Sequence, residues 1–261
     1  MNSRLELIKP IVRVGNSAGV LLPREWLNGK ARIELVEKPL DIKRDILEIL
    51  SDYLDEVLGV YLTGSYARGE QTDESDVDVL VITNKSNKTL KSGKYEIILV
   101  SREKLERQVK ENALPLVPML VEAKVIINPE LLKNCQNLRI SSRNLKFHIE
   151  TTKSALKVAR EFLELNKSGK VSDNIVYSLV LRARESYIVD CLNEGKIATT
   201  KGFLQLLDKI GAGKEAYLSY LRAKSDKKAV SSVSLDDALK IHTYLENKIK
   251  EQERWIKERS S

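Results

Sequence analysis

The stretch that most constrains this chain runs from Leu58 to Thr83 and reads LGVYLTGSYARGEQTDESDVDVLVIT. It begins with an apolar run that stops at Gly64 and Ser65, and it ends with Asp76 and Asp78 leading into a second apolar run. Two runs rich in β-branched residues, separated by glycine and polar residues, predict two strands joined by a connection. Because side chains alternate along a strand, Asp76 and Asp78 would face the same way.

Two carboxylates on one face of a strand repel each other unless a cation neutralises them. A hard divalent cation such as Mg²⁺, which binds a few carboxylates together with phosphate oxygens, suits such a pair. Gly64 would let the backbone approach a phosphate closely, and Ser65 would open a short helical segment whose free N–H groups suit an anion. The stretch therefore predicts a phosphate site beside a metal site. An acidic hairpin with a solvated face is the structural alternative.

The segments GSYARG and SDVDVLV resemble the motif of the nucleotidyltransferases of the DNA polymerase beta superfamily, above all the minimal nucleotidyltransferases. This resemblance implies an α+β fold with a polymerase-beta-like core and a mixed sheet. It implies Mg²⁺-dependent transfer of a nucleoside monophosphate from an NTP, with ATP expected, to a hydroxyl acceptor. Asp76 and Asp78 would hold Mg²⁺, with two ions expected at the site. Gly64 and Ser65 would bind the β and γ phosphates, and Arg68 would steady the triphosphate or the leaving pyrophosphate.

The same resemblance implies a third carboxylate on the following strand. The run KYEIILV, residues 94–100, predicts that strand, and Glu96 is the only acid in it. The family usually has Asp at this place, so Glu96 is a departure, although its longer side chain could still reach a metal. An exposed Glu on an edge strand is the alternative interpretation.

Residues 4–38 predict a small β unit with strands over 4–15, 20–23 and 31–37 and a helical turn over 24–27. The segment VRVGNSAGVLLPREW resembles the AbrB/MazE-type swapped-hairpin domains, which interleave two chains and bind DNA. That resemblance implies a homodimer with these residues near DNA or available to it: Arg13, Asn16, Ser17, Arg24 and Lys30. A dimerisation or docking element without DNA is the alternative.

The remaining chain predicts two further domains, giving boundaries of 1–38, 39–135 and 136–261. In the middle domain we expect a helix after Asp41, a polar loop over 84–93, a helix from Ser101 and a final strand over 119–127. After Pro129 only helical patterns follow. The predicted helices are 143–167, 173–194, 201–210, 214–223 and 234–257. A helical domain in this place resembles the HEPN-like or kanamycin-nucleotidyltransferase-type bundles of the superfamily.

Three further features carry weaker hypotheses. Arg143 and His148 have the R-x4-H spacing of HEPN ribonucleases, although that motif usually lies late in its domain. His242 falls in an apolar seam, which favours a core histidine. Cys135 and Cys191 lie in helical patterns and are too few for a disulfide framework or a thiolate metal site, so we expect core residues.

The sequence also predicts where in the cell the protein is located. No apolar run approaches the roughly 20 residues that span a bilayer, and the start MNSRLELIKP is unlike a signal peptide, so we expect a cytoplasmic protein without membrane contact. The formal net charge of +7 gathers in the two flanks, which suggests contact with a polyanion outside the acidic centre.

The leading interpretation is a nucleotidyltransferase acting on a protein, an RNA end or a small molecule, with a possible regulatory role. The alternative is a DNA-binding transcriptional or antitoxin-type regulator whose transferase core is weak or inactive.

Overall fold

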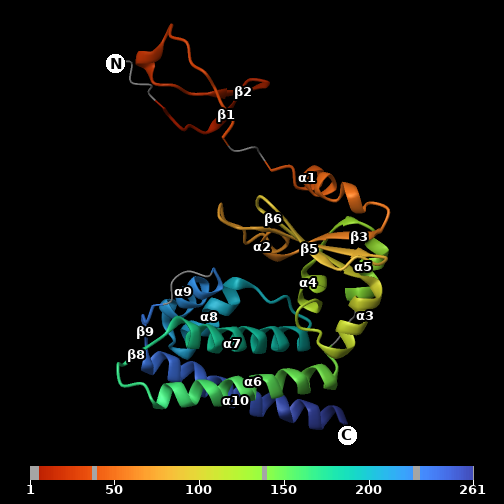
Figure 1. The fold of residues 1–261 in the computed structure, drawn as a ribbon, viewed down its shortest axis with the longest axis vertical. Helices are drawn as coiled ribbons and strands as arrows, with labels where there is room; N and C mark the ends of the chain where they lie inside the picture. The colour runs from red at the N-terminus through yellow and green to blue at the C-terminus, as the bar shows by residue number, and fades with distance from the viewer. Residues whose placement is uncertain (1–5, 37–39, 137–139, 226–229, 261) are drawn as a thin grey trace. The chain divides into compact units, whose positions relative to one another are not determined.

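The computed structural model describes residues 6–36, 40–136, 140–225 and 230–260. The chain divides into two compact units, Met1–Asp41 and Ile42–Ser261 (Figure 1). The predicted domains 39–135 and 136–261 both lie almost entirely in the second unit, and their division from each other stays a prediction.

The first unit is a β-hairpin followed by a helical turn. Strands β1 (Ile11–Val14) and β2 (Ser17–Val20) pair in antiparallel register around a two-residue turn, where Gly15 has a φ of 60°. The 3-10 turn η1 (Arg24–Trp26) lies in the predicted place. The first predicted strand, 4–15, was too long, the second lies at 17–20 instead of 20–23, and residues 31–36 form no strand. A strand needs a hydrogen-bonding partner, and the described part of this unit offers only one pair.

None of the described residues 6–36 is buried. Many of them are apolar, and their side chains are largely exposed to solvent. These residues are Leu7, Ile8, Ile11, Val14, Leu21, Leu22, Leu27, Ile33, Leu35 and Val36. A two-stranded hairpin of this size is marginally stable by itself in water, because it removes too little apolar surface from solvent. Burial of these side chains therefore requires something beyond the hairpin.

The second unit contains a five-stranded mixed sheet in the order β5-β6-β4-β3-β7. Its strands are β3 (Val57–Leu62), β4 (Val77–Thr83), β5 (Lys88–Ser92), β6 (Tyr95–Ser101) and β7 (Lys124–Ile127). β4 and β6 are parallel, and the other neighbouring pairs are antiparallel. The predicted α+β class with a mixed sheet is confirmed.

Both faces of this sheet are covered by helices, because the central strands are apolar on both sides. Val77, Val79 and Val81 face helix α1 (Ile42–Ile49), whose Ile46 is fully buried against them. Leu80 lies in the opposite core. That second face packs against α3 (Arg102–Glu111), α4 (Val117–Glu122) and α5 (Pro129–Gln136). Asp78, by strand alternation, belongs to this second face.

Two expectations for the sheet region were wrong. The polar loop expected at 84–93 contains strand β5, which pairs with β6 and takes the edge position. Strand β6, which carries Glu96, is therefore an inner strand. The strand expected over 119–127 begins only at Lys124, because Pro118 opens the short helix α4 instead.

The remainder of the second unit is a helical bundle. Its helices are α6 (Ser142–Glu164), α7 (Asp173–Asn193), α8 (Thr200–Ile210), α9 (Gly213–Lys224) and α10 (Leu235–Ser260). All five agree with the predicted helices. Figure 1 shows α6 running opposite to α7 and α10. A short pair, β8 (Lys170–Val171) with β9 (Val233–Ser234), corrects the expectation that only helices follow Pro129.

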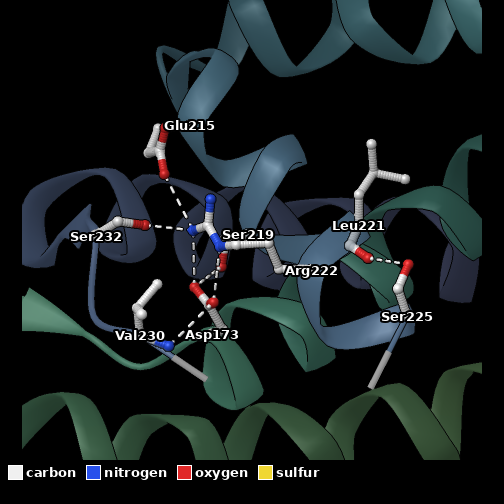
Figure 2. Close-up of polar contacts among 8 residues, drawn as sticks. All are labelled: Asp173, Glu215, Ser219, Leu221, Arg222, Ser225, Val230 and Ser232. Carbon is white, nitrogen blue, oxygen red and sulfur yellow. Dashed lines mark hydrogen bonds and ion pairs between the residues drawn. The ribbon is translucent and has the colours of Figure 1, made fainter. Parts of the chain in front are cut away.

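The buried carboxylate of Asp173, at the start of α7, accepts hydrogen bonds from side chains of α9. Asp173 has no exposed side-chain surface and accepts hydrogen bonds from Ser219 Oγ at 2.7 Å and from Arg222 Nε at 2.9 Å (Figure 2). The amide N–H of Val230 also donates to it at 3.2 Å. Glu215 and Ser232 bind the same guanidinium. This network joins segments of the bundle that are more than 40 residues apart in sequence.

No helix among the described residues is both long enough and apolar enough to cross a membrane.

Candidate active site

The turn between β3 and α2 places backbone directly against Asp78. Helix α2 (Gly64–Arg68) starts at Gly64, where φ is 66°. A Cβ atom on Gly64 would lie 2.0 Å from Asp78 Oδ2. The N–H of Thr63 donates to the carbonyl oxygen of Asp78 at 2.9 Å, which fixes this approach. Glycine is therefore required both by the left-handed conformation and by the space beside the carboxylate.

Asp78 and Glu96 are direct partners in the parallel pairing of β4 with β6. Paired residues of neighbouring strands project from the same face of a sheet, so both carboxylates lie on one side. Asp76 precedes β4 and is exposed. Burial raises the pKa of Asp78, and the negative charges of Glu96, Asp76 and Glu122 raise it further, while Lys224 on α9 opposes the rise. Negative charge thus accumulates around Asp78.

A divalent cation fits this charge distribution. Among the residues that the structure describes, no three His, Cys, Asp or Glu side chains form a ready metal cluster. Mg²⁺ does not require one, because it usually takes one or two carboxylates and completes its shell with water and substrate phosphates. The paired positions of Asp78 and Glu96 supply two such carboxylates. The raised pKa of Asp78 reflects burial first and repulsion by neighbouring carboxylates second, and a bound cation would offset both.

The sequence did not predict the part played by Glu122, the last residue of α4. Its Oε1 accepts the N–H of Gly64 at 2.7 Å, and its Oε2 accepts Arg68 Nη1 at 2.6 Å. Only 8% of its side-chain surface is exposed. These two donors are the ones that the motif assigns to phosphate. A carboxylate of the same protein therefore holds the predicted phosphate-binding groups.

Glu70 links this site to the helical bundle. Its carboxylate accepts Arg68 Nε at 2.8 Å and the backbone N–H groups of Thr200 and Lys201, at the start of α8, at 3.1 and 3.4 Å. Burial alone would raise the pKa of Glu70, but these hydrogen bonds outweigh burial and lower it. Burial likewise opposes ionisation of Arg68, but Glu70 and Glu122 raise its pKa overall. Arg68 is therefore held between two carboxylates and stays charged.

Two sequence signals could have revealed these partners. Pro118 at the start of an apolar segment is a helix-opening signal, and a helix over 117–122 would have placed Glu122 at its end. Glu70 follows the GSYARG segment directly. The contribution of Lys224 had no signal in the sequence, because it depends on where α9 packs.

The remaining predicted site residues fall into separate places. Arg13, Asn16, Ser17, Arg24 and Lys30 are all exposed in the first unit. Ser65 is half-buried in α2, and its carbonyl oxygen accepts the N–H groups of Gly69 and Glu70.

The histidines behave as structural residues. Arg143 is exposed whereas His148 is buried, so the R-x4-H pair does not share a surface. His242 is buried as expected, and its Nε2 lies 3.1 Å from the carbonyl oxygen of Leu156.

A family model described as a nucleotidyltransferase domain matches residues 43–178, more than half of the chain. The chain belongs to this nucleotidyltransferase family. The match runs from α1 through the paired carboxylates into the first half of α7. It confirms the predicted resemblance for the core and shows that the protein is a nucleotidyltransferase. The likeness of the first unit to swapped-hairpin domains and of the bundle to HEPN-like domains stays a prediction.

Two relatives of this nucleotidyltransferase come from Methanocaldococcus jannaschii, and both carry the name protein adenylyltransferase. One is 43% identical over 77 residues, which cover 30% of this chain and 74% of the relative. The other is 35% identical over 96 residues, covering 37% and 86%. The solved spectinomycin adenyltransferase AAD(9) from Enterococcus faecialis, with ATP and spectinomycin, is 15% identical. It aligns over 79% of this chain and 97% of its own with a TM-score of 0.43.

Proposed function

We propose that this nucleotidyltransferase moves AMP from ATP to a hydroxyl group of a protein, with Mg²⁺ as its cofactor. The observation that carries the proposal is the pairing of Asp78 with Glu96 on one face of the sheet, directly beside the obligatory glycine of the β3–α2 turn. The choice of ATP and of a protein acceptor is supported by the names of the two relatives, which are 43% and 35% identical in the matched region.

Asp76, Asp78 and Glu96 are the residues that would hold Mg²⁺, as one ion or two. Bound there, the metal would neutralise charge that develops on the triphosphate during in-line displacement, and little covalent chemistry would be left to the protein. The backbone at Gly64 and Ser65 binds phosphate oxygens, and Arg68 steadies the triphosphate or the departing pyrophosphate. Glu96 accepts the proton of the attacking hydroxyl group.

In this reaction the nucleotide has to compete with the carboxylate of Glu122. Its carboxylate accepts hydrogen bonds from both Gly64 and Arg68, so a phosphate must displace it before these groups can bind nucleotide. The exchange of one anion for another leaves Arg68 paired throughout, because Glu70 keeps its own bond to Nε.

The proposal is tested with α-labelled ATP, GTP, CTP and UTP, Mg²⁺ and a host lysate, followed by identification of the labelled species. We expect label from ATP to enter protein, and none to enter with Asp78→Asn. Mg²⁺ should raise the melting temperature of the wild type, and raise it less for Asp78→Asn and Glu96→Gln. Labelling of RNA or of a small molecule would replace the protein acceptor. Equal Mg²⁺ shifts in the three proteins would remove the metal assignment.

A second function is favoured by the first unit. All five basic or polar residues predicted near DNA are exposed, and the same unit exposes a set of apolar side chains that its described residues leave uncovered. Interleaving of two chains would bury the apolar set and leave the basic residues free for DNA. A DNA-binding regulator and a transferase can coexist in one chain, and the salt dependence of DNA affinity tests the regulator directly.

A further inference from the structure

Helix α6 carries an apolar stripe on its solvent side. The exposed fractions of its largest members are 45% for Phe147, 51% for Val158 and 58% for Phe162. The chain has three phenylalanines in all, and two of them lie on this one stripe. The face of α6 that packs into the bundle is a different one, formed by Leu145, Ile149 and Leu156 among others. The stripe is therefore additional to the apolar face that builds the bundle.

The stripe has a two-fold pattern. Its six positions within α6 are Phe147, Thr151, Ser154, Ala155, Val158 and Phe162, at three- and four-residue spacing, and Leu165, the C-cap residue, extends the same face beyond the helix. The large side chains lie at the two ends, and the small ones lie at the centre. A second α6 laid antiparallel across it, with the two-fold axis between Ser154 and Ala155, would set Phe147 against Phe162 and Thr151 against Val158. Small residues at the crossing let two helices approach closely, near the 8–10 Å typical of packed helices.

A row of charges beside the stripe is also two-fold, and its midpoint lies one residue earlier, between Lys153 and Ser154. In an antiparallel pair the same flank of each helix lies side by side, so each charge meets its counterpart across the axis. Arg143 then lies near Glu164 of the second copy, and Lys146 lies near Glu161 of the second copy. Glu150 similarly lies near Lys157 of the second copy. Every pair combines opposite charges, and all six side chains are exposed.

We propose that two copies of this chain associate through antiparallel contact of their α6 helices, centred between Ser154 and Ala155. The contact is isologous, because both copies use the same face of α6 and each supplies the apolar side chains and the charges that contact the other copy. This contact uses none of the proposed catalytic residues and no residue of the first unit. The contact is one helix pair long, so it falls in the range of small, reversible interfaces.

The first test is a site-specific cross-link in the full chain. In the Ser154→Cys variant the two thiols meet at the two-fold axis, so mild oxidation should give a covalent dimer on a non-reducing gel. Leu165→Cys is the matched control, because Leu165 is 77% exposed at the end of the same helix face. The same geometry separates its two copies by about 30 Å along the helices, at 1.5 Å per residue. Wild type gives the background from Cys135 and Cys191. No dimer with Ser154→Cys, or equal dimer with Leu165→Cys, would overturn the proposal.

The second test exchanges charges in the Ser154→Cys background. In the two-fold pair, residue 146 of each copy lies near residue 161 of the other copy, so Lys146→Glu or Glu161→Lys creates two contacts between like charges. Each variant should reduce the rate of cross-linking by roughly tenfold. The double variant restores opposite charges and should recover the rate to within about twofold. Lys110→Glu, on α3, is exposed and changes the net charge equally, so it should have no effect. A double variant as slow as the single ones would contradict the antiparallel register.

Discussion

At the scale of single residues, Gly64 is the position where both conformation and space exclude every other side chain. Its φ is positive, and a Cβ there would meet the Asp78 carboxylate. Gly69, five residues later, also has a positive φ of 73°, but a Cβ there would meet nothing within 4 Å. A comparison of the two glycines therefore separates the cost of the backbone conformation from the cost of displacing the Asp78 carboxylate.

We expect Gly64→Ala to lower the transfer rate by roughly a hundredfold or more, because a displacement of about 1 Å at a reacting centre has that effect. Gly69→Ala should share the conformational cost of about 1 kcal/mol and keep most of the rate. Single-turnover labelling measures the rate, and thermal unfolding measures the shared loss of stability. Equal losses of rate in the two variants would show that Gly64 acts through stability alone.

Glu122 makes a second prediction at this scale. Replacement by Gln keeps an oxygen that can accept from Gly64 but removes the charge that a triphosphate must displace. We expect Glu122→Gln to bind ATP about five- to tenfold more tightly, since bonds to an ionised acceptor are roughly twice as strong as neutral ones. Titration calorimetry with MgATP measures the affinity, with Glu130→Gln on α5 as the exposed control. Weaker binding in Glu122→Gln would mean that the carboxylate supports the nucleotide site instead of competing for it.

At the scale of elements, α7 and α9 are joined by the ion pair of Asp173 with Arg222, whose two side chains differ in burial (Figure 2). Asp173 is fully buried, whereas Arg222 is 27% exposed and has Glu215 as a second anion. The hydrogen bonds from Arg222 lower the pKa of Asp173 although burial opposes this. Loss of either residue should be costly, but the costs should differ.

We expect Arg222→Leu to destabilise the protein by about 4 kcal/mol, because it leaves a buried carboxylate without its cation. Asp173→Asn should cost less, about 2 kcal/mol, because Arg222 keeps Glu215 and reaches water. Urea unfolding measures both free energies, and Lys209→Leu on the exposed side of α8 is the control. An equal or reversed order would contradict the unequal burial of the pair.

The packing of α6 against α7 and α10 predicts a pH dependence. Burial and, to a smaller extent, the nearby charge of Arg182 lower the pKa of His148 to about 4, although a hydrogen bond with Gln252 opposes the shift. Ser186 Oγ lies 3.2 Å from its Nε2, and Glu185 lies 4.0 Å from its Nδ1. Because the ring is neutral above pH 4, its approach to Glu185 is not an ion pair at neutral pH.

The unfolded chain protonates His148 below about pH 6.5, whereas the folded chain does so only near pH 4. Between these values the unfolded state binds more protons, so stability falls as the pH falls. At 1.36 kcal/mol per pH unit, the loss from this residue between pH 6.5 and 5 is about 2 kcal/mol. Urea unfolding at pH 7 and pH 5 should therefore show a steeper loss in wild type than in His148→Gln. Parallel losses in the two proteins would assign the pH dependence to other groups.

At the scale of the whole molecule, the first unit has to find burial for apolar side chains that it cannot cover itself. Leu21 and Ile33 are each 70% exposed. We expect Leu21→Asp with Ile33→Asp to remove one association step, seen by light scattering, and to abolish DNA affinity. The proposed DNA-binding function predicts that Lys30→Glu weakens DNA binding and reduces its salt dependence without changing assembly, because one cation fewer would meet the phosphates. The Ser154→Cys cross-link should persist in both variants, and its loss would show that the two contacts are one.

Most secondary-structure elements of the second unit are determined by local sequence signals, so the sequence alone was sufficient to predict them. The strands around GSYARG and SDVDVLV, the cap at Ser101 and the five helices of the bundle follow from side-chain alternation, three-to-four periodicity and turn residues. These signals act over a few residues, so a single sequence contains them. The strand that carries Glu96 was also recognised from the sequence, but the register of β6 against β4 decided that Glu96 faces the same side as Asp78.

Tertiary structure decided what depends on residues far apart in the chain. The edge strand β5 exists because β6 offers it a partner, and the described residues of the first unit offer none to residues 31–36. Glu122 reaches Gly64 across 58 residues, and Glu70 reaches the start of α8 across 130. Hydrogen-bond partners, unlike periodicity, are chosen by packing among segments that the sequence does not place side by side. Two features could therefore be found only in the folded chain. One is the negative charge around Asp78, and the other is the hydrogen bonding of Glu122 to Gly64 and Arg68, the groups predicted to bind phosphate.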